Sequence, residues 1–564
     1  MFRVLGKLRW PIQSACFFVF LALFFYVCWP YDVRHHAEAR AAREIVEAET
    51  FLALDPLVSV STALAARAWV WPLAWAGVLL AICLVIPRGF CSYACPFGTL
   101  LDAFNWAVGK RMKSLHVKKR GWWVHLRYYL LAGVLAAAVC GVLLSGFVAA
   151  TPVFTRAMMY LVAPLQLGFA KGWYLIPPMH AGHWLSIGLF AFTIVLGLLG
   201  ARFWCRCLCP SGAVFSAANT LRLTERRVTD ACIECGKCVR ACSFDAINPD
   251  FTTRPLDCTF CQSCARACPV SAIHFGWRSV GGASVPRVAL RGAETPRPQV
   301  PCVSDRPLSR RGFAAGLGAG LVVASGMRQL RGAPPDAPPL RPPGSVPEPR
   351  FLQLCVRCGQ CLKACPFNAL QPMGFEGGFE SLWTPRLAPD WVGCEPKCNN
   401  CGQVCPTGAI RALPLDEKRA ARIGLAIVNE ATCLPYLGTE ACQMCFDECR
   451  AAGYDAIEFV RVHVEVGDDG QPVEGSGFSA PVVLADKCNG CGLCQSRCYH
   501  INAKQKRLMA ESSIVVIAGP GNEDRLSHGS YLALREAERR QREEERKGLQ
   551  LKGAGDSYLP DFLR

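Results

Sequence analysis

The sequence has few acidic residues, and it contains no residue constellation typical of a hydrolase or a transferase. Its 44 Asp and Glu are outnumbered by 61 Lys and Arg, which gives a net charge of +17. Most of these basic residues lie beside apolar segments and in linkers, so they indicate membrane topology rather than nucleic-acid binding. We therefore expect no nucleic-acid partner.

The sequence is rich in hydrophobic residues and in cysteine. Hydrophobic residues make up 52% of its 564 residues, a composition typical of membrane proteins. Four apolar runs have roughly the 20 residues that a membrane-spanning helix needs, at 10–30, 68–87, 128–150 and 184–200. The first run could instead be a cleaved signal peptide, but no small-residue cleavage site follows it closely, so we expect a retained helix. Basic residues collect at the N-terminus, after the second run and after the fourth, which predicts that both ends of this unit face the cytoplasm.

Two matching cysteine motifs follow the second and fourth runs. Each has the pattern C-x3-C-P followed closely by glycine, and the cysteines are Cys91, Cys95, Cys205 and Cys209. Cysteines four apart share one face of a helix, so the two pairs could hold one cluster or a metal ion between them. Packing or a reversible dithiol is the alternative interpretation, and the pattern leaves the cofactor open.

The 34 cysteines mostly recur in tight clusters, which favours metal ligation over a disulfide scaffold. The first two groups have the spacing C-x2-C-x2-C-x3-C of bacterial ferredoxins, in which the fourth cysteine binds the cluster of the other group. The spacing predicts one [4Fe-4S] cluster on Cys232, Cys235, Cys238 and Cys268, and another on Cys258, Cys261, Cys264 and Cys242. Zinc is the alternative, but zinc ribbons rarely repeat this run.

Ser309 to Met327 combines two arginines with a short Gly/Ala-rich apolar run. Ser309, Arg310, Arg311 and Phe313 fit the S-R-R-x-F pattern of a twin-arginine export signal, which is either cleaved or kept as a fifth transmembrane helix. The apolar part, Phe313 to Met327, is only 15 residues long, and Arg328, Arg331 and Arg341 beyond it violate the positive-inside rule. An exposed basic pair before a buried helix is the competing interpretation.

Four more cysteine groups follow, with enough ligands for four further [4Fe-4S] clusters and six in all. They are Cys355, Cys358, Cys361 and Cys365; Cys394, Cys398, Cys401 and Cys405; Cys433, Cys442, Cys445 and Cys449; and Cys488, Cys491, Cys494 and Cys498. Because the first and last groups have regular spacing and the middle two do not, we expect nested pairing, with adjacent pairing as the alternative. Cys16, Cys28, Cys83 and Cys140 lie in apolar runs as packing residues, and Cys207 and Cys302 have no predicted role.

The predicted fold class is an α-helical membrane domain, with four transmembrane helices and a fifth, joined to α+β bacterial ferredoxin-like domains. The predicted segments are a membrane domain at 1–222, a two-cluster ferredoxin domain at 223–280, a linker at 281–308, a twin-arginine signal or transmembrane segment at 309–327, a Pro-rich linker at 328–350, a four-cluster ferredoxin domain at 351–520 and a charged tail at 521–564. The tail is predicted to be a solvated helix, or a docking arm for a partner.

These motifs together resemble a known pair of proteins. Residues 1 to about 280 resemble the NapH-type membrane subunit of periplasmic nitrate reductase systems. Residues 309 to about 530, with SRRGF, CVRCGQCLKACP, CPTGAI and GNEDRLSHGSY, resemble the exported four-cluster NapG-type subunit. The chain is thus similar to a natural fusion of the two, although Ser243 and the spacing from Cys394 to Cys401 depart from the regular ferredoxin pattern.

The resemblance implies a multi-pass protein of the bacterial inner membrane that takes electrons from quinol. It implies contact with membrane lipid and the quinone pool, a cytoplasmic two-cluster domain, a periplasmic four-cluster domain, and a periplasmic redox partner such as a c-type cytochrome or a reductase. A quinol site needs an apolar cleft and a proton acceptor near one surface. The candidate residues near the outer ends of the helices are Asp55, Arg156, His180 and His183. A maturation factor for a periplasmic metalloenzyme and a cytoplasm-facing polyferredoxin are the alternative functions.

Overall fold

The computed structural model describes residues 2–26, 50–109, 111–117, 121–170, 172–278, 309–329, 338–467, 471 and 473–555. The predicted linker at 281–308, part of the Pro-rich linker, the end of the tail, Cys28 and Cys302 lie outside the described residues.

The N-terminal part is a helical bundle. Its main helices are α1 (Phe2–Tyr26), α4 (Pro56–Ala66), α5 (Pro72–Val85), α7 (Leu126–Val139), α9 (Ala150–Leu161) and α11 (Ala181–Val195). Several begin where the sequence provides a capping residue or a proline at the first turn, since proline there loses no helical hydrogen bond. Asp55 caps α4 in this way, and Pro56 and Pro72 occupy the first turns of α4 and α5.

Three helical segments among the described residues are long and apolar enough to span a membrane: Leu8–Phe25, Trp122–Val139 and Ala181–Leu199. They correspond to the first, third and fourth predicted runs. The second run forms α5, which has 14 residues because it begins at Pro72 and ends at Val85, where Ile86 leaves helical geometry with φ −116° and ψ 85°. Four full-length spans are therefore not found in the described part of the chain.

The two-cluster domain is a small α+β unit. Strand β1 (Thr224–Val228) pairs antiparallel with β2 (Ile273–Trp277), and Thr224 lies opposite Trp277. The helices α13 (Lys237–Ala241) and α14 (Ser263–Arg266) lie between the strands in the sequence, one in each cysteine group. The domain contacts the bundle through Tyr93, whose hydroxyl donates to Phe260 O at 3.0 Å, and through the ion pair of Arg127 with Asp257.

The predicted export segment forms α15 (Arg310–Gln329), which packs along α7. A Cβ added at Gly316 would lie 2.7 Å from Tyr129 O, and one at Gly320 would lie 2.2 Å from Gly133 O. Further along, Arg328 donates to Cys140 O. The residue numbers at successive contacts increase in the same direction along both helices, so α7 and α15 run parallel. Only glycine permits this backbone approach, as in other close helix pairs of membrane proteins.

The four-cluster domain consists of short helices and two-stranded sheets. The helices in its cysteine groups are α17 (Gln360–Ala364), α18 (Asn400–Gln403), α20 (Leu434–Leu437), α21 (Met444–Ala451) and α22 (Leu493–Cys498). Antiparallel pairs form between β3 (Leu370–Pro372) and β4 (Pro385–Leu387), β5 (Leu425–Val428) and β8 (Ile514–Ile517), and β6 (Ile457–Val462) and β7 (Phe478–Val483). The core of this domain is built largely from its cysteines and aliphatic residues.

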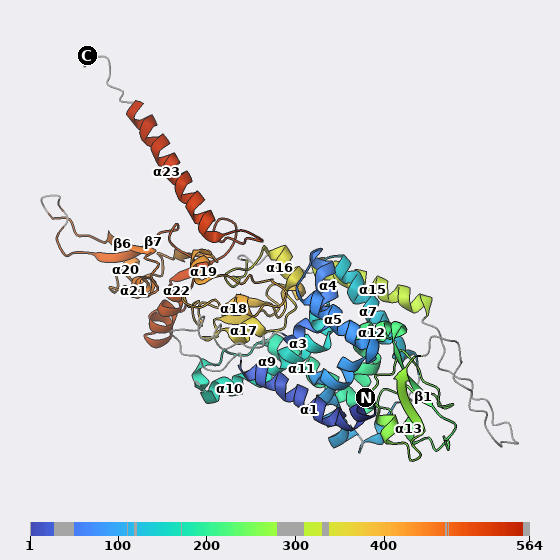
Figure 1. Cartoon of the computed structure of the whole chain (residues 1–564). Coiled ribbons are helices and arrows are strands. Elements are labelled where there is room, and N and C mark those ends of the chain that lie inside the picture. The colour runs from blue at the N-terminus through green and yellow to red at the C-terminus, as the bar shows by residue number, and fades with distance from the viewer. Residues whose placement is uncertain are drawn as a thin grey trace.

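The two ferredoxin-like domains lie at different ends of the bundle (Figure 1). The two-cluster domain, with β1 and α13, is at one end, and the four-cluster domain extends from the other as far as β6 and β7. At the second junction, Arg357 Nη1 donates to Leu143 O at 3.0 Å, and Trp383 Nε1 donates to Gly182 O at 2.7 Å. The charged tail forms α23 (Tyr531–Gly555), which projects away from the domain (Figure 1).

Candidate metal centres

The eight ferredoxin-type cysteines of the two-cluster domain gather in two sets. Site 1 is a cavity lined by Cys232, Cys235, Cys238 and Cys268. Site 2 joins Cys258, Cys261, Cys264 and Cys242, whose thiols interact with one another electrostatically. Each set takes its fourth cysteine from the other group, as the spacing predicts.

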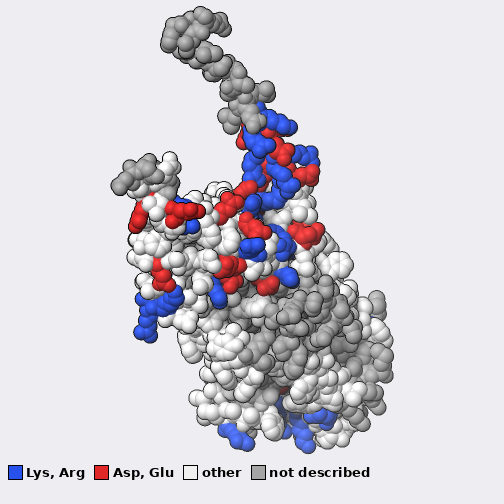
Figure 2. Space-filling view, turned by 90° about the vertical axis from the view of Figure 1, so that its left-hand side faces the viewer, with Lys and Arg blue, Asp and Glu red and all other residues white. Residues whose placement is uncertain are grey.

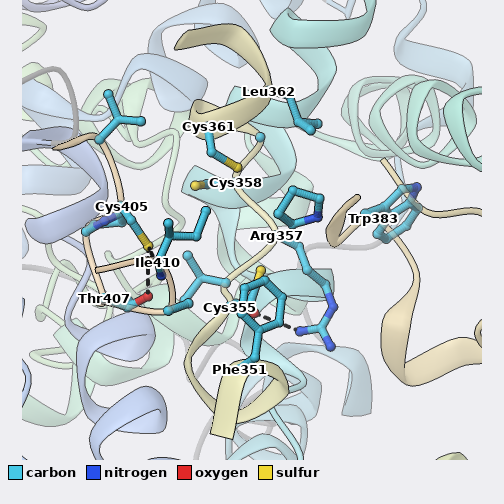
Figure 3. Close-up of a pocket in the computed structure, with 16 residues that line it drawn as sticks. Phe351, Cys355, Arg357, Cys358, Cys361, Leu362, Trp383, Cys405, Thr407 and Ile410 are labelled. Atoms are coloured by element: carbon cyan, nitrogen blue, oxygen red, sulfur yellow. Dashed lines mark hydrogen bonds between the residues drawn. The ribbon is translucent and has the colours of Figure 1, made fainter. Parts of the chain in front are cut away.

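The four-cluster domain repeats this exchange between neighbouring groups. Site 3 is lined by Cys355, Cys358, Cys361 and Cys405, and Figure 3 shows their sulfurs turned toward a common space. Site 4 brings Cys365 to Cys394, Cys398 and Cys401. Site 5 is lined by Cys433, Cys442, Cys445 and Cys498, and site 6 brings Cys449 to Cys488, Cys491 and Cys494.

The nested pairing expected from the spacing is therefore wrong, and the adjacent pairing is correct. The irregular spacing of the middle groups changes only the loops within each group. The fourth cysteine lies at or near the end of a short helix in both regular and irregular groups: Cys365 follows α17, and Cys449 lies in the last turn of α21.

The four-cysteine sites fit iron–sulfur clusters. Sites 3, 1 and 5 are each lined by four cysteines among mostly apolar residues, the ligand number that a [4Fe-4S] cluster takes. The fourth cysteines accept backbone N–H groups, such as Ala246 N to Cys242 Sγ at 3.2 Å and Ala456 N to Cys449 Sγ at 3.3 Å. Hydrogen bonds to sulfur are one means by which proteins tune cluster potentials.

Burial also disfavours the thiolate form of these cysteines unless iron binds them. Burial raises the pKa of Cys491 to about 12 and that of Cys445 to about 12. Such thiols stay protonated at neutral pH without a metal, because a buried charge is costly. Among the described residues, no group of three or more His, Cys, Asp or Glu side chains is placed to hold a single metal ion. Sets of four cysteines suit a [4Fe-4S] cluster, in which each thiolate binds a different iron.

Buried cations lie beside several sites, where they would offset the negative charge of a thiolate-bound cluster. Arg226, which is 6% exposed, interacts with Cys238 and with Cys264. Arg357 is 1% exposed next to Cys355, and Lys418 is 3% exposed next to Cys394. Buried charges need such compensation.

Sites 3 to 6 form a row in the order 3, 4, 6, 5. Cys361 of site 3 interacts with Cys401 of site 4. Cys394 N of site 4 donates to Cys491 O of site 6 at 2.7 Å, and Cys494 of site 6 interacts with Cys445 of site 5. Site 3 adjoins the helical bundle, and site 5 lies toward the β6–β7 end (Figure 1).

Three of the four predicted quinol-site residues lie together at the bundle junction with site 3. Arg156 donates to Ser186 Oγ at 2.9 Å and to Arg357 O at 3.2 Å, and its guanidinium lies 3.8 Å from the centroid of the Trp383 ring. The His183 ring lies 4.2 Å from His180 and 4.6 Å from Tyr160, measured between centroids.

Tyr160 and Trp383 were not identified from the sequence. Tyr160 is buried, and its hydroxyl interacts electrostatically with Arg156 and with Cys358 of site 3. Trp383 comes from the four-cluster domain, so no pattern in the helical segments points to it.

Asp55 lies apart from that group. It caps α4, and its Oδ2 accepts hydrogen bonds from Thr151 and Ser211, each at 3.1 Å. Ser211 directly follows the second C-x3-C-P motif, and Cys209 interacts electrostatically with Asp55. Asp55 thus belongs to the surroundings of the C-x3-C-P cysteines rather than to the His180 and His183 pair.

The cysteine exchange predicts which substitutions affect the same centre. We expect Cys405→Ser and Cys358→Ser to change the same electron paramagnetic resonance signal of the reduced protein, and the double variant to change no further signal. Cys498→Ser should instead change the signal that Cys442→Ser changes. Coupling of Cys498 with Cys358 would contradict adjacent pairing.

Known sequence families match the cysteine segments. One family, described as a 4Fe-4S binding domain, matches residues 68–121 and 182–226, the two segments that carry the C-x3-C-P motifs. A second family with the same description matches residues 226–248 and 352–371. No solved structure matches the chain.

Several relatives are ferredoxin-type proteins. The chain is 38% identical over 193 residues to the methylamine utilization ferredoxin-type protein MauM of Paracoccus denitrificans, a match that covers 34% of this chain and 78% of MauM. It is 34% identical to the ferredoxin-type protein NapG of Escherichia coli over 34% of this chain and 74% of NapG. It is 28% identical to the ferredoxin-type protein MauN of Paracoccus denitrificans over 33% of this chain and 60% of MauN. The NapG-like resemblance of the sequence is thereby confirmed, and this chain belongs to the family of ferredoxin-type iron–sulfur proteins that includes MauM and NapG.

Proposed function

We propose that the protein is a membrane-bound electron relay, which oxidises quinol and passes electrons through [4Fe-4S] clusters to a periplasmic redox partner. The observation that carries this proposal is the unbroken row of cysteine sites from the bundle junction to the far end of the four-cluster domain. A row of one-electron centres in close succession suits electron transfer rather than bond-making chemistry.

The membrane arrangement of this proposal has the two-cluster domain in the cytoplasm and the four-cluster domain in the periplasm, with α15 as a further transmembrane helix. The parallel packing of α7 and α15 supports it, because both helices lead from the two-cluster end toward the four-cluster end. Figure 2 also supports it, since charged side chains gather over the upper part of the visible face and on α23, above a largely uncharged region. The NapH-like character of the first half is part of this proposal and is supported by the match of the segments 68–121 and 182–226 to a 4Fe-4S binding domain family.

The chemistry requires two electrons and two protons to leave each quinol. Oxidation to quinone would release the electrons one at a time into site 3, because each cluster accepts one electron. The protons would pass one at a time to His183, which would release them to the aqueous surface beside the partly buried His180 ring. Tyr160, between His183 and site 3, would orient the quinol hydroxyl.

Electrons would leave the row at site 5. Its cavity is lined by Met444, Pro481 and Met509 in addition to its cysteines, and it lies at the end of the domain farthest from the bundle (Figure 1). The acceptor in this proposal is a periplasmic c-type cytochrome or reductase that docks at this end.

The proposal is tested by quinol-driven reduction of the clusters in membranes. We expect His183→Phe to slow this reduction by about 100-fold, the usual order of magnitude for loss of a proton acceptor. Dithionite, which needs no proton transfer from quinol, should reduce the same clusters fully. His116→Phe is the matched control, since His116 is exposed and its Nε2 hydrogen-bonds to Gly109 O at 3.2 Å, away from the His180 and His183 pair. Clusters that stay oxidised with quinol in the unaltered protein would contradict the proposed function.

A further inference from the structure

The two C-x3-C-P motifs fold as matched halves. In each, the first cysteine lies in a π-helix, Phe90–Ala94 or Trp204–Leu208, and the second is extended, with φ −65° and ψ 113° at Cys95 and φ −65° and ψ 110° at Cys209. A helix then begins at the proline, and Gly98 N and Gly212 N each donate to the second cysteine's Sγ at 3.4 Å. This backbone N–H to sulfur contact also occurs at the ferredoxin-type sites of this protein.

The four cysteines of the two motifs face one another across the bundle. Cys95 interacts electrostatically with both Cys205 and Cys91, and Cys209 interacts with the same two thiols. All four are free thiols. Cys95 and Cys205 pack against the same core as Phe97 and Trp204, so the thiols converge in a dry environment.

Two buried arginines cross between the halves. Arg202, three residues before Cys205, donates to Cys91 O and lies 3.1 Å from a Cβ added at Gly98. Arg88, three residues before Cys91, makes the equivalent approach to Gly212 at 3.2 Å. Each arginine therefore contacts the opposite motif. Both arginines stand at the same position of a repeated R-x2-C-x3-C-P pattern in the sequence.

Three buried arginines, Arg9, Arg88 and Arg202, lie around these thiols, where Asp55 and Asp102 are the neighbouring carboxylates. Arg202 and Arg9 share one carboxylate, Asp102, at 2.7 and 2.8 Å. Arg88 forms no direct ion pair among the described residues, although Asp257 interacts with it electrostatically. It is fully buried and leaves Nε and Nη2 without a hydrogen-bond partner. A buried guanidinium in this state is strongly unfavourable unless a negative group lies beside it.

We propose that Cys91, Cys95, Cys205 and Cys209 together bind one [4Fe-4S] cluster, with Arg88 and Arg202 as its counter-charges. Four thiolates on a [4Fe-4S]²⁺ core carry a net charge of −2, which would give Arg88 and Arg202 a negative group beside them. A single zinc ion does not suit the site, because the described residues contain no group of three ligands placed for one ion.

This cluster would connect the two ferredoxin-like domains, a role that rests on the proposed relay. Toward site 2, Tyr93 lies between Cys91 and Cys95 in the sequence and interacts with Cys258 and Cys261. Phe244 of the two-cluster domain lies under both arginines, with centroid distances of 5.4 Å to Arg88 and 4.9 Å to Arg202. Toward site 3, Val214 and Cys358 pack against one common core.

The test is iron content and electron paramagnetic resonance of the full-length protein, purified without oxygen. We expect Cys205→Ser and Cys91→Ser each to lose about four irons per chain, and the double variant to lose no more than either alone. Cys207→Ser is the matched control, because Cys207 is buried in the same π-helix but faces Arg206 and Arg127. An unchanged iron content in Cys205→Ser relative to Cys207→Ser, or a loss of two irons, would overturn the assignment.

A second variant tests the assignment without removing a cysteine, in case the cysteine variants do not fold. Arg88→Met keeps the volume but removes the charge, so one cluster should retain its iron and shift to a more negative midpoint potential. No shift in any cluster would overturn the role of Arg88. The experiment distinguishes failure of the proposed cluster from failure of the proposed relay. Loss of four irons with unchanged quinol-driven reduction of sites 1 to 6 would support the cluster but contradict its role in the relay.

Discussion

Gly320→Leu is expected to separate α15 from α7 and to destabilise the assembled protein by about 3 kcal/mol or more. A Cβ at this position would lie 2.2 Å from Gly133 O and 2.6 Å from Gly133 Cα, and both atoms belong to backbone that cannot rotate away. The helices must therefore move apart, which removes the contacts of Ala324 with the core formed by Ala137 and Val142. The expected result is a lower thermal midpoint of the purified protein and faster proteolysis next to residue 329.

Gly318→Leu is the matched control for this prediction. It introduces the same side chain two residues away on the same helix, where an added Cβ meets no atom within 4 Å. It therefore carries the same cost in helix propensity and apolar exposure without the clash. Equal thermal midpoints for the two variants would show that α15 does not pack on α7.

Arg357→Met is expected to loosen the four-cluster domain from the bundle. The Arg357 guanidinium donates to Leu143 O, Cys355 O and Glu380 O, and it lies 4.4 Å from the Phe147 ring centroid. Methionine has a similar length but no donor, so three buried carbonyl groups lose a partner at a cost of about 1–3 kcal/mol each before any relief from removing the charge. We expect a thermal midpoint lower by roughly 6 °C and a loss of quinol-driven reduction at sites 3 to 6.

Two controls separate loss of docking from loss of clusters. Arg450→Met removes an exposed arginine of the same domain and should leave both the midpoint and the reduction unchanged. Dithionite should still reduce sites 4 to 6 in Arg357→Met, since their cysteines do not touch this arginine. A variant with unaltered quinol-driven reduction would show that electrons do not cross the junction at Arg357.

The cysteine ligands could be recognised from the sequence because their spacing is a local property. A turn followed by a short helix directs the first three thiols of a group toward one centre, whatever the rest of the chain does. The site that the fourth cysteine joins is not a local property. Cys405 joins site 3 and Cys498 joins site 5 because neighbouring groups pack on each other, and the irregular loop before Cys442 has no influence on that packing.

The quinol-site prediction shows the same limit. His180 and His183 are close in the sequence, and both lie at the start of α11, so their proximity follows from one helical turn. Arg156 joins them only because α9 packs against α11, and Asp55 lies elsewhere because it caps α4 beside Ser211. Arg357 and Trp383 complete the group from a domain about 200 residues further along, which is beyond any local pattern.

By itself, the sequence determined the classes of site, three of the four predicted apolar spans and the order of the domains, since each depends on spacing or composition within a few turns. Only the tertiary structure decided the row of sites 3, 4, 6 and 5, the parallel contact of α7 with α15, and the exchange of Arg88 and Arg202 between the two halves. These features arise where separate segments bury their surfaces against each other, and the free energy of that packing depends on shape and charge in three dimensions.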